Sequence, residues 1–171
     1  MRTRTSTIAS RIATPEDGDL VTALIAASYA RLDDGSYDRD AIAAAMPLMA
    51  RANPALLASG TYFIAEANGE PAGCGGWTFA APGSGQTVDG VAHIRHFATH
   101  PDHLRKGVAR ALLDRCLSEA AAAGARLMKC QSTLPGERFY AAAGFRRVRM
   151  IEVPLGPGVT LPSVEMERPL P

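Results

Sequence analysis

The sequence predicts a mixed α/β (α+β) fold in a single domain built around one sheet, and three observations indicate it. Strand-like and helix-like segments follow one another in the order β-α-α-β-β-β-α-β-α-β-β. The pair Asn68-Gly69 separates two β-rich runs, which is typical of an antiparallel hairpin. The chain has 171 residues, 47% of them hydrophobic and 20% charged. This composition argues against disorder and suits about one domain with a sizeable core.

The N-terminal part of the chain predicts a strand and two helices. The segment ASRIA, which ends at Ala13, has the composition of a short strand. Thr14 is a favourable N-cap residue, and Pro15 suits the first helical position that follows it. Apolar residues then recur at helical spacing from Leu20 onward. A second helix is predicted over about residues 38–51.

Residues 61–80 predict the hairpin. A type I′ turn needs left-handed backbone at both central positions, and Asn68-Gly69 supplies them. The second strand of this hairpin contains Gly73, Gly75 and Gly76. Glycines inside a strand indicate a bulge or a close approach of another segment.

The second half of the chain predicts the remaining elements. A strand over 91–100 leads into a helix over about 104–123 whose apolar face contains Val108, Leu112, Cys116 and Ala120. A strand, a short helix and a final strand pair then follow at 126–132, at 135–145, and at 145–153 with 163–170.

Charge and cysteine content limit the classes of function. The net charge of +1 gives no general case for binding nucleic acid or an anionic membrane, so a basic site must be local. The three cysteines form no CxxC pair and no metal-like cluster, which is typical of buried, reduced thiols in the cytosol. No signal peptide or membrane span is visible. We therefore expect a soluble, cytoplasmic protein without a metal, in which residues 1–7 are loose.

Cations gather where the predicted helix begins. Arg105, Lys106 and Arg110 lie near a helix N-terminus, whose dipole disfavours each positive charge by about 0.3–1 kcal/mol. The N–H groups of a first turn lack partners, and Gly107 would let a bulky anion approach them. These features predict a site for a polyanion, particularly phosphate. The segment is not a nucleotide P-loop, because it lacks the first glycine and the terminal Gly-Lys-Ser/Thr.

Two segments resemble the GCN5-related N-acetyltransferase (GNAT) family. Leu104-Arg105-Lys106-Gly107-Val108-Ala109 is similar to that family's acetyl-CoA loop, Q/R-x-x-G-x-G/A, although the leucine departs from the first position. We expect Arg105 or Arg110 to replace the missing contact. The segment from Phe139-Tyr140 to Gly144-Phe145 is similar to the family's second motif. In element order the resemblance covers residues 8–167, and it is most specific over 93–145.

The resemblance implies a fold and a cofactor site. The fold would be a mostly antiparallel sheet of about seven strands, splayed between strands 4 and 5, with helices on both faces. The pantetheine arm of acetyl-CoA, the co-substrate, would pair with the fourth strand as an added strand does. The implied cofactor-binding residues are Phe97, Ala98, Thr99, Leu104, Arg105, Lys106, Gly107, Val108, Ala109 and Arg110.

The resemblance also implies catalytic residues. Tyr140 occupies the position of the family's usual general acid, and a phenol can protonate a departing thiolate. Backbone N–H groups near Phe97 and Ala98 would stabilise the oxyanion. His93 falls where some members carry a glutamate base, while His96 and an ordered water are alternatives. Regular alternation would place His93, Arg95, Phe97 and Thr99 on one face and His96 on the other, unless a bulge shifts the phase.

The implied function is transfer of an acetyl group from acetyl-CoA to the primary amine of a small molecule or peptide. The first two helices, the loop at 82–90 and the final strand pair would shape the acceptor site. One alternative is a non-catalytic acyl-CoA-binding or sensor domain, and another is transfer to a hydroxyl or of a longer acyl chain. A homodimer is compatible with the sequence. No nucleic-acid or membrane partner is expected, since aromatic residues make up 6% of the chain and acids balance bases.

Overall fold

The structure is a computed structural model, and it describes residues 7–171. The described strands are β1 (Ile8–Ile12), β2 (Tyr62–Ala67), β3 (Glu70–Thr78), β4 (Val91–Thr99), β5 (Leu127–Ser132), β6 (Arg146–Gly156) and β7 (Val159–Pro169). The described helices are α1 (Gly18–Tyr29), α2 (Arg39–Met49), α3 (Pro54–Leu57), α4 (Val108–Ala122) and α5 (Glu137–Ala142). Short 3-10 turns lie at Pro15–Asp17, Ala30–Leu32 and Pro101–His103.

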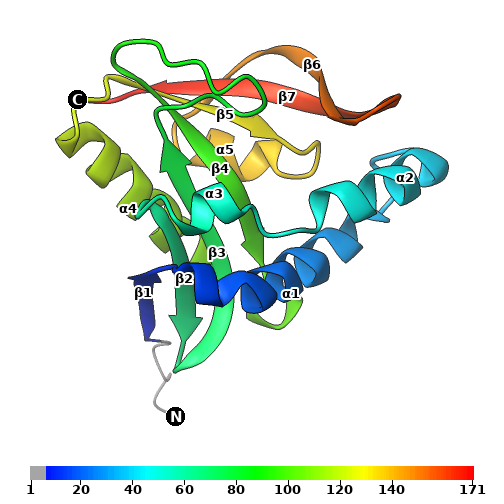
Figure 1. The fold of residues 1–171 in the computed structure, drawn as a ribbon, viewed down its shortest axis with the longest axis horizontal. Helices are drawn as coiled ribbons and strands as arrows, with labels where there is room; N and C mark the ends of the chain where they lie inside the picture. The colour runs from blue at the N-terminus through cyan, green and yellow to red at the C-terminus, as the bar shows by residue number, and fades with distance from the viewer. Residues whose placement is uncertain (1–6) are drawn as a thin grey trace.

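The strands form one sheet in the order β1-β2-β3-β4-β5-β7-β6 (Figure 1). All neighbouring strands run antiparallel except β4 and β5. This parallel pair is short, because only Val91–His93 of β4 pairs with Leu127–Lys129 of β5. Beyond it the strands separate, so residues 94–99 and 130–132 have no partner across the gap. The predicted mixed, mostly antiparallel sheet that splays between strands 4 and 5 is confirmed.

Helices cover both faces of the sheet, as predicted. On one face, α4 and α5 enclose the largest core cluster, which contains Phe63, Trp77, Leu112 and Tyr140. On the other face, α1 and α3 pack around Val21, Ile25, Leu57 and Tyr62. A third cluster joins α2 to β7 through Ile42, Ala45 and Leu161. In Figure 1 the β6–β7 ribbon extends beside α2 at one edge of the molecule.

Local signals in the sequence account for most element boundaries. Asn68 and Gly69 both have positive φ, 52° and 83°, as the predicted hairpin turn requires. The second predicted helix is α2, and the Asp38 side chain caps it by accepting a hydrogen bond from the N–H of Ala41 at 3.2 Å. The short helix α3 was not predicted. Asn53 starts it by accepting from the N–H of Ala55 at 2.9 Å.

The start of the fourth helix was predicted wrongly. The expected helix began at residue 104, whereas α4 begins at Val108. Arg105 and Gly107 have φ values of 59° and 83°, and an α-helix cannot contain these left-handed conformations. Arg105 and Lys106 therefore lie in a loop ahead of the helix instead of in its first turn.

The cysteines are buried, as expected. Cys74, Cys116 and Cys130 are free thiols, and burial raises the pKa of Cys74 and of Cys130 to about 12. Within residues 7–171 no group of three or more His, Cys, Asp or Glu side chains is arranged to hold a metal ion. In the same range no helix has the length and apolar character that a membrane crossing requires.

The expectation of a loose start over residues 1–7 lies, apart from Thr7, outside the described residues. The N–H of Thr7 donates to Asn68 Oδ1 at 3.1 Å, so this residue is attached to the hairpin turn.

An ion pair ties β1 to the start of α1. Arg11 donates two hydrogen bonds to the Asp17 carboxylate at 2.8 and 2.9 Å, and the N–H of Thr14 donates a third at 2.8 Å. The Arg11 hydrogen bond is the main reason why the pKa of Asp17 falls from 3.8 to about 2.

We expect Asp17→Asn to lower the free energy of unfolding by about 1 kcal/mol at pH 7, because it removes this partly exposed ion pair and a helix-start contact. The pKa of Asp17 is lower in the folded protein. Its contribution is therefore present above about pH 4 and is lost as the pH falls toward 2. Chemical denaturation of both proteins across this range measures the effect. Asp19→Asn is the control, since Asp19 forms no ion pair with described residues. A difference independent of pH would contradict this account.

Candidate active site

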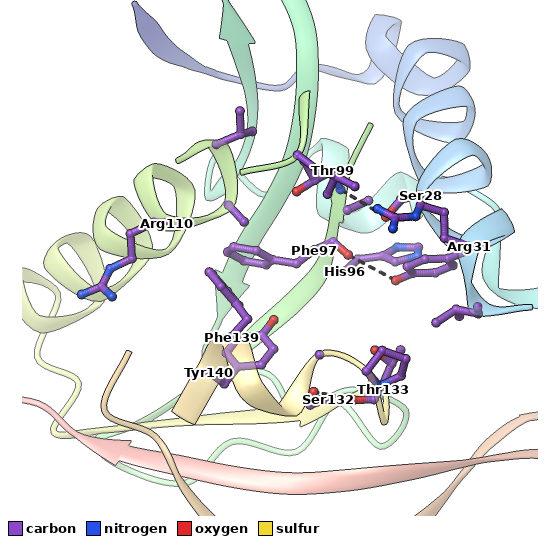
Figure 2. Close-up of a pocket in the computed structure, with 18 of the residues that line it drawn as sticks. Ser28, Arg31, His96, Phe97, Thr99, Arg110, Ser132, Thr133, Phe139 and Tyr140 are labelled. Carbon is purple, nitrogen blue, oxygen red and sulfur yellow. Dashed lines mark hydrogen bonds between the residues drawn. The ribbon is translucent and has the colours of Figure 1, made fainter. Parts of the chain in front are cut away.

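The gap between β4 and β5 opens into a cavity of about 770 Å³, called the main cavity below. Four parts of the chain line it: the end of α1 with the turn after it, the open half of β4, the loop before α4 with that helix's start, and the segment from the end of β5 into α5 (Figure 2). The main cavity therefore occupies the splay that the family resemblance predicted.

Nearly all predicted cofactor-binding residues line the main cavity. They are Phe97, Ala98, Thr99, Leu104, Arg105, Gly107, Val108, Ala109 and Arg110. Lys106 does not line it; its Nζ lies 3.3 Å from Nδ1 of His103. His103 is a buried residue of the same loop, and its Nε2 lies 3.6 Å from Glu70 Oε2. Nothing in the sequence pattern distinguished His103.

The loop before α4 presents an unusual row of donors. The backbone N–H groups of residues 105–110, called the amide cradle below, have no hydrogen-bond acceptor within residues 7–171. Successive N–H groups around left-handed residues such as Arg105 and Gly107 form an anion-binding concavity. The dipole of the 15-residue helix α4 adds partial positive charge at the same place. The cradle fits a phosphate or diphosphate group.

The cations around the amide cradle are not equally available. Arg105 is exposed, whereas Arg110 Nε donates to Asp114 Oδ1 at 3.0 Å on the next turn of α4. In Figure 2 the Arg110 side chain points away from Phe97 and Thr99. The unpaired backbone N–H groups of this loop are therefore more available to an anion than the Arg110 side chain is.

Two residues of α1 contact the open edge of β4. The N–H of Thr99 donates to Ser28 Oγ at 3.2 Å, and the Tyr29 hydroxyl donates to the Phe97 carbonyl at 3.4 Å (Figure 2). The amide of Thr99, a residue predicted to offer main-chain groups to pantetheine, thus already has a partner. Sequence reasoning missed Ser28 and Tyr29, because small and aromatic residues are ordinary in an amphipathic helix.

A β-bulge interrupts β4 at the splay. Cys74 pairs with Ala98 and Gly76 with Arg95, so β4 uses three steps where β3 uses two. The extra residue has a left-handed backbone: φ of His96 is +52°. The predicted glycine-rich irregularity is confirmed here.

The bulge changes which face each side chain of β4 occupies. Ile94 and Phe97 both pack with the cluster under α4, although they are three positions apart and regular alternation would place them on opposite faces. His93 and Arg95 alternate with Ile94 and so lie on the opposite face from Phe97. The regular alternation of His93, Arg95 and Phe97 therefore does not hold, because the exception that the sequence analysis allowed, a bulge that shifts the phase, occurs here.

Tyr140 lies in an aromatic group at the floor of the main cavity. Its ring centroid lies 5.0 Å from that of Phe139, 5.4 Å from that of Phe145 and 6.4 Å from that of Phe97. Its hydroxyl makes no hydrogen bond with the described residues. It is also not among the side-chain polar atoms of these residues that are both fully buried and without a partner. The hydroxyl therefore reaches open space. Burial raises the pKa of Tyr140 well above 10, so the phenol stays protonated.

His93 lies beside a second cavity. It pairs in register with Lys129 and lines a pocket of about 330 Å³ together with the 81–88 loop. Ile94 and Gln131 line both cavities, so the two adjoin. Burial is the main cause that lowers the pKa of His93, and the charges of Lys129 and Arg95 add to it. His93 is thus not among the residues that line the main cavity with Tyr140, and its catalytic role stays a prediction.

A family model for the acetyltransferase (GNAT) domain matches residues 58–147, more than half of the 171 residues. The chain belongs to the GNAT acetyltransferase family. The match contains three of the four parts that line the main cavity: the open half of β4, the loop before α4 with that helix's start, and the segment from the end of β5 into α5. The end of α1 lies outside the matched residues. No curated protein matches the sequence.

Solved structures resemble this GNAT protein over nearly its whole length. The GCN5-related N-acetyltransferase (aminotransferase, class-II) from Rhodopseudomonas palustris has 24% identity and a TM-score of 0.77, covering 99% of this chain and 100% of its own. PaiA N-acetyltransferase from Thermoplasma acidophilum, in complex with coenzyme A, has 15% identity and a TM-score of 0.68, covering 95% and 99%. The yncA protein from Salmonella typhimurium, with its cofactor acetyl-CoA, has 20% identity and a TM-score of 0.63, covering 97% and 95%. These similarities establish the fold.

Gly75 makes room for Phe97 in this GNAT fold. A Cβ built at Gly75 would lie 2.5 Å from Cδ2 of the Phe97 ring, so the ring would have to move. We expect Gly75→Ala to destabilise the protein by about 1–3 kcal/mol, as overpacking does. In a Phe97→Leu background the loss should shrink, and a double-mutant cycle by chemical denaturation measures this coupling.

Gly18→Ala is the matched control for Gly75→Ala. A Cβ at Gly18 would lie 3.7 Å from Leu57 Cδ1, which is an ordinary contact in a helix. This variant should gain up to about 1 kcal/mol. Additive effects of Gly75→Ala and Phe97→Leu would show that the two residues do not compete for space.

Proposed function

We propose that this GNAT protein transfers an acetyl group from acetyl-CoA to the primary amine of a small molecule or peptide. The observation that carries the proposal is the amide cradle of residues 105–110 at one part of a cavity that also holds Tyr140. A diphosphate suits the cradle, and an acyl thioester suits the gap.

The amide cradle would hold the diphosphate of acetyl-CoA through backbone donors and the α4 dipole. Arg105 adds an exposed cation. Because the backbone supplies these donors, Leu104 in place of the family's Gln or Arg does not remove the site. The pantetheine arm would follow the open edge of β4, where residues 94–99 have no partner on β5. The coenzyme A and acetyl-CoA in the two bound relatives support this assignment.

Acetyl transfer to an amine has three requirements that the residues of the main cavity can meet. Backbone N–H groups near Phe97 and Ala98, beside the bulge of β4, would stabilise the negative charge that develops on the thioester oxygen. Tyr140, kept protonated by burial, can donate a proton to the departing sulfur. The attacking amine needs a proton acceptor, and β4 offers His93 in the adjoining cavity and His96 in the main one.

We expect Gly107→Glu to abolish binding of coenzyme A while the fold persists, because it adds bulk and negative charge to the amide cradle. A Cβ at this position has only Ile8 Cδ1 within 4 Å, at 3.6 Å, so the core is not disturbed. Isothermal titration calorimetry with coenzyme A measures the loss. Gly158→Glu is the control, because it has a similar positive φ of 71° in the β6–β7 turn and does not line the main cavity. Unchanged affinity in Gly107→Glu would refute the cradle as the site.

We expect Tyr140→Phe to reduce kcat by about 10²-fold or more and to leave the affinity for coenzyme A nearly unchanged, because it removes only the acid. Release of free thiol from acetyl-CoA with a panel of amines measures turnover. Tyr37→Phe is the control. The Tyr37 hydroxyl bonds to Pro162 and Leu134 outside the main cavity, so its loss should affect stability and not kcat. Equal kcat for Tyr140→Phe and the unmodified protein would exclude the acid role. Binding without amine-dependent turnover would favour the sensor alternative.

A further inference from the structure

His96 occupies an unusual backbone conformation at the point where β4 leaves β5. Its φ of +52° is left-handed, which few residues other than glycine adopt, although histidine is among the better tolerated. Such strain persists only where the surroundings hold it, and it concentrates at functional sites. The surroundings of His96 therefore indicate what its side chain does.

Three hydrogen bonds from separate elements hold the bulge. His96 Nε2 bonds to the carbonyl of Met49 at the end of α2 at 2.9 Å. The Tyr62 hydroxyl of β2 donates to the His96 carbonyl at 2.7 Å, and the Tyr29 hydroxyl of α1 donates to the next carbonyl, that of Phe97, at 3.4 Å. The Met49 carbonyl thus holds the imidazole ring, and the two tyrosine hydroxyls hold the backbone that carries it.

The partner of Nε2 determines the tautomer of His96. A carbonyl only accepts, so Nε2 carries the hydrogen, and the neutral ring has its lone pair on Nδ1. Nδ1 has no hydrogen-bond partner within residues 7–171. It is also not among the side-chain polar atoms of these residues that are both fully buried and without a partner. It therefore reaches open space, and the side chain lines the main cavity. In Figure 2 His96 extends toward α1 while the Phe97 ring extends toward α4.

The groups around His96 keep its ring neutral. Arg95 on β4 is the charge that acts on it, and it disfavours a second positive charge. Tyr29 of α1, Tyr62 of β2 and Cys74 of β3 have raised pKa values because they are buried, so they stay uncharged at pH 7. The element α2 contributes the Met49 carbonyl, whose hydrogen bond to the ring acts in the opposite direction and raises the pKa of His96. Burial is the main cause that lowers the pKa of His96 from 6.5.

We propose that His96 is the catalytic base of this GNAT protein, and that its Nδ1 accepts the proton of the acceptor amine. The inference rests on the proposed acetyl transfer. His96 and Tyr140 line the same cavity, and the Met49 carbonyl holds the His96 ring in the tautomer whose Nδ1 can accept a proton. His93 would have to act from the adjoining cavity.

The proton and electron balance of the step is complete. The neutral amine forms a nitrogen–carbon bond to the thioester carbonyl and becomes positively charged. Nδ1 of His96 takes one proton from that nitrogen, while the carbon–sulfur bond breaks with its electron pair on sulfur. Tyr140 donates its proton to the sulfur, and the imidazolium returns a proton to the phenolate directly or through water. The products are the amide and the free thiol of coenzyme A.

His96→Asn tests the proposal, because asparagine tolerates a left-handed backbone and cannot accept the proton. We expect kcat to fall by about 10²–10⁴-fold, with the coenzyme A affinity unchanged by calorimetry. The rise of kcat/KM with pH, through a pKa below 6.5 in the unmodified protein, should disappear. Added imidazole should restore part of the activity of His96→Gly. His100→Asn, directly after β4 and outside the main cavity, is the matched control.

A readout independent of activity is the imidazole tautomer, which ¹⁵N NMR of the unmodified protein reports. We expect the hydrogen on Nε2 at neutral pH. A hydrogen on Nδ1 would overturn the proposal even if His96→Asn failed to fold. Unchanged kcat in His96→Asn, or a loss confined to a parallel His93→Asn variant, would also overturn it. An unmodified protein that binds coenzyme A but acetylates no amine would instead refute the proposed function, on which this role depends.

Discussion

The separation of β4 from β5 after three paired residues is the constraint on which the site depends. Beyond His93, the edge of β4 that faces β5 has no strand partner, and buried backbone groups need other partners. Two come from α1: Ser28 accepts from Thr99, and Tyr29 donates to Phe97. The helices on that face therefore support an open strand edge and leave a cavity beside it.

The loop before α4 also has backbone groups without partners in secondary structure, but here no other described element supplies the missing partners. Left-handed Arg105 and Gly107 prevent the helix from starting earlier, and the N–H groups of residues 105–110 have no acceptor in the described chain. Unpaired donors are unfavourable unless water or an anion meets them. The open half of β4 and most residues of the amide cradle line the main cavity, so an elongated ligand with an anionic part can contact both.

Much of the fold was predictable from local patterns. Asn68-Gly69 determined the hairpin turn, and the apolar stripe of α4 predicted which face it buries. The family motifs predicted the splay, the cavity-lining loop and the position of Tyr140 in the cavity. The helix start at residue 104 was wrong, because periodicity does not reveal the left-handed conformation of Arg105. The roles of Ser28, Tyr29 and Tyr62 were missed, since each depends on a partner far away in the chain.

The sequence by itself determined the order of elements, the tight hairpin turn and the composition of the loop before α4 that is expected to bind phosphate, because each depends on neighbouring residues. Only the tertiary structure decided where the side chains of β4 point. A single extra residue at His96 shifts the alternation, and its position depends on hydrogen bonds from β2, α1 and α2. In the folded protein His96 lines the main cavity and His93 lines the adjoining one. Local spacing in the sequence does not encode this outcome, because it depends on pairing between segments that are far apart in the chain.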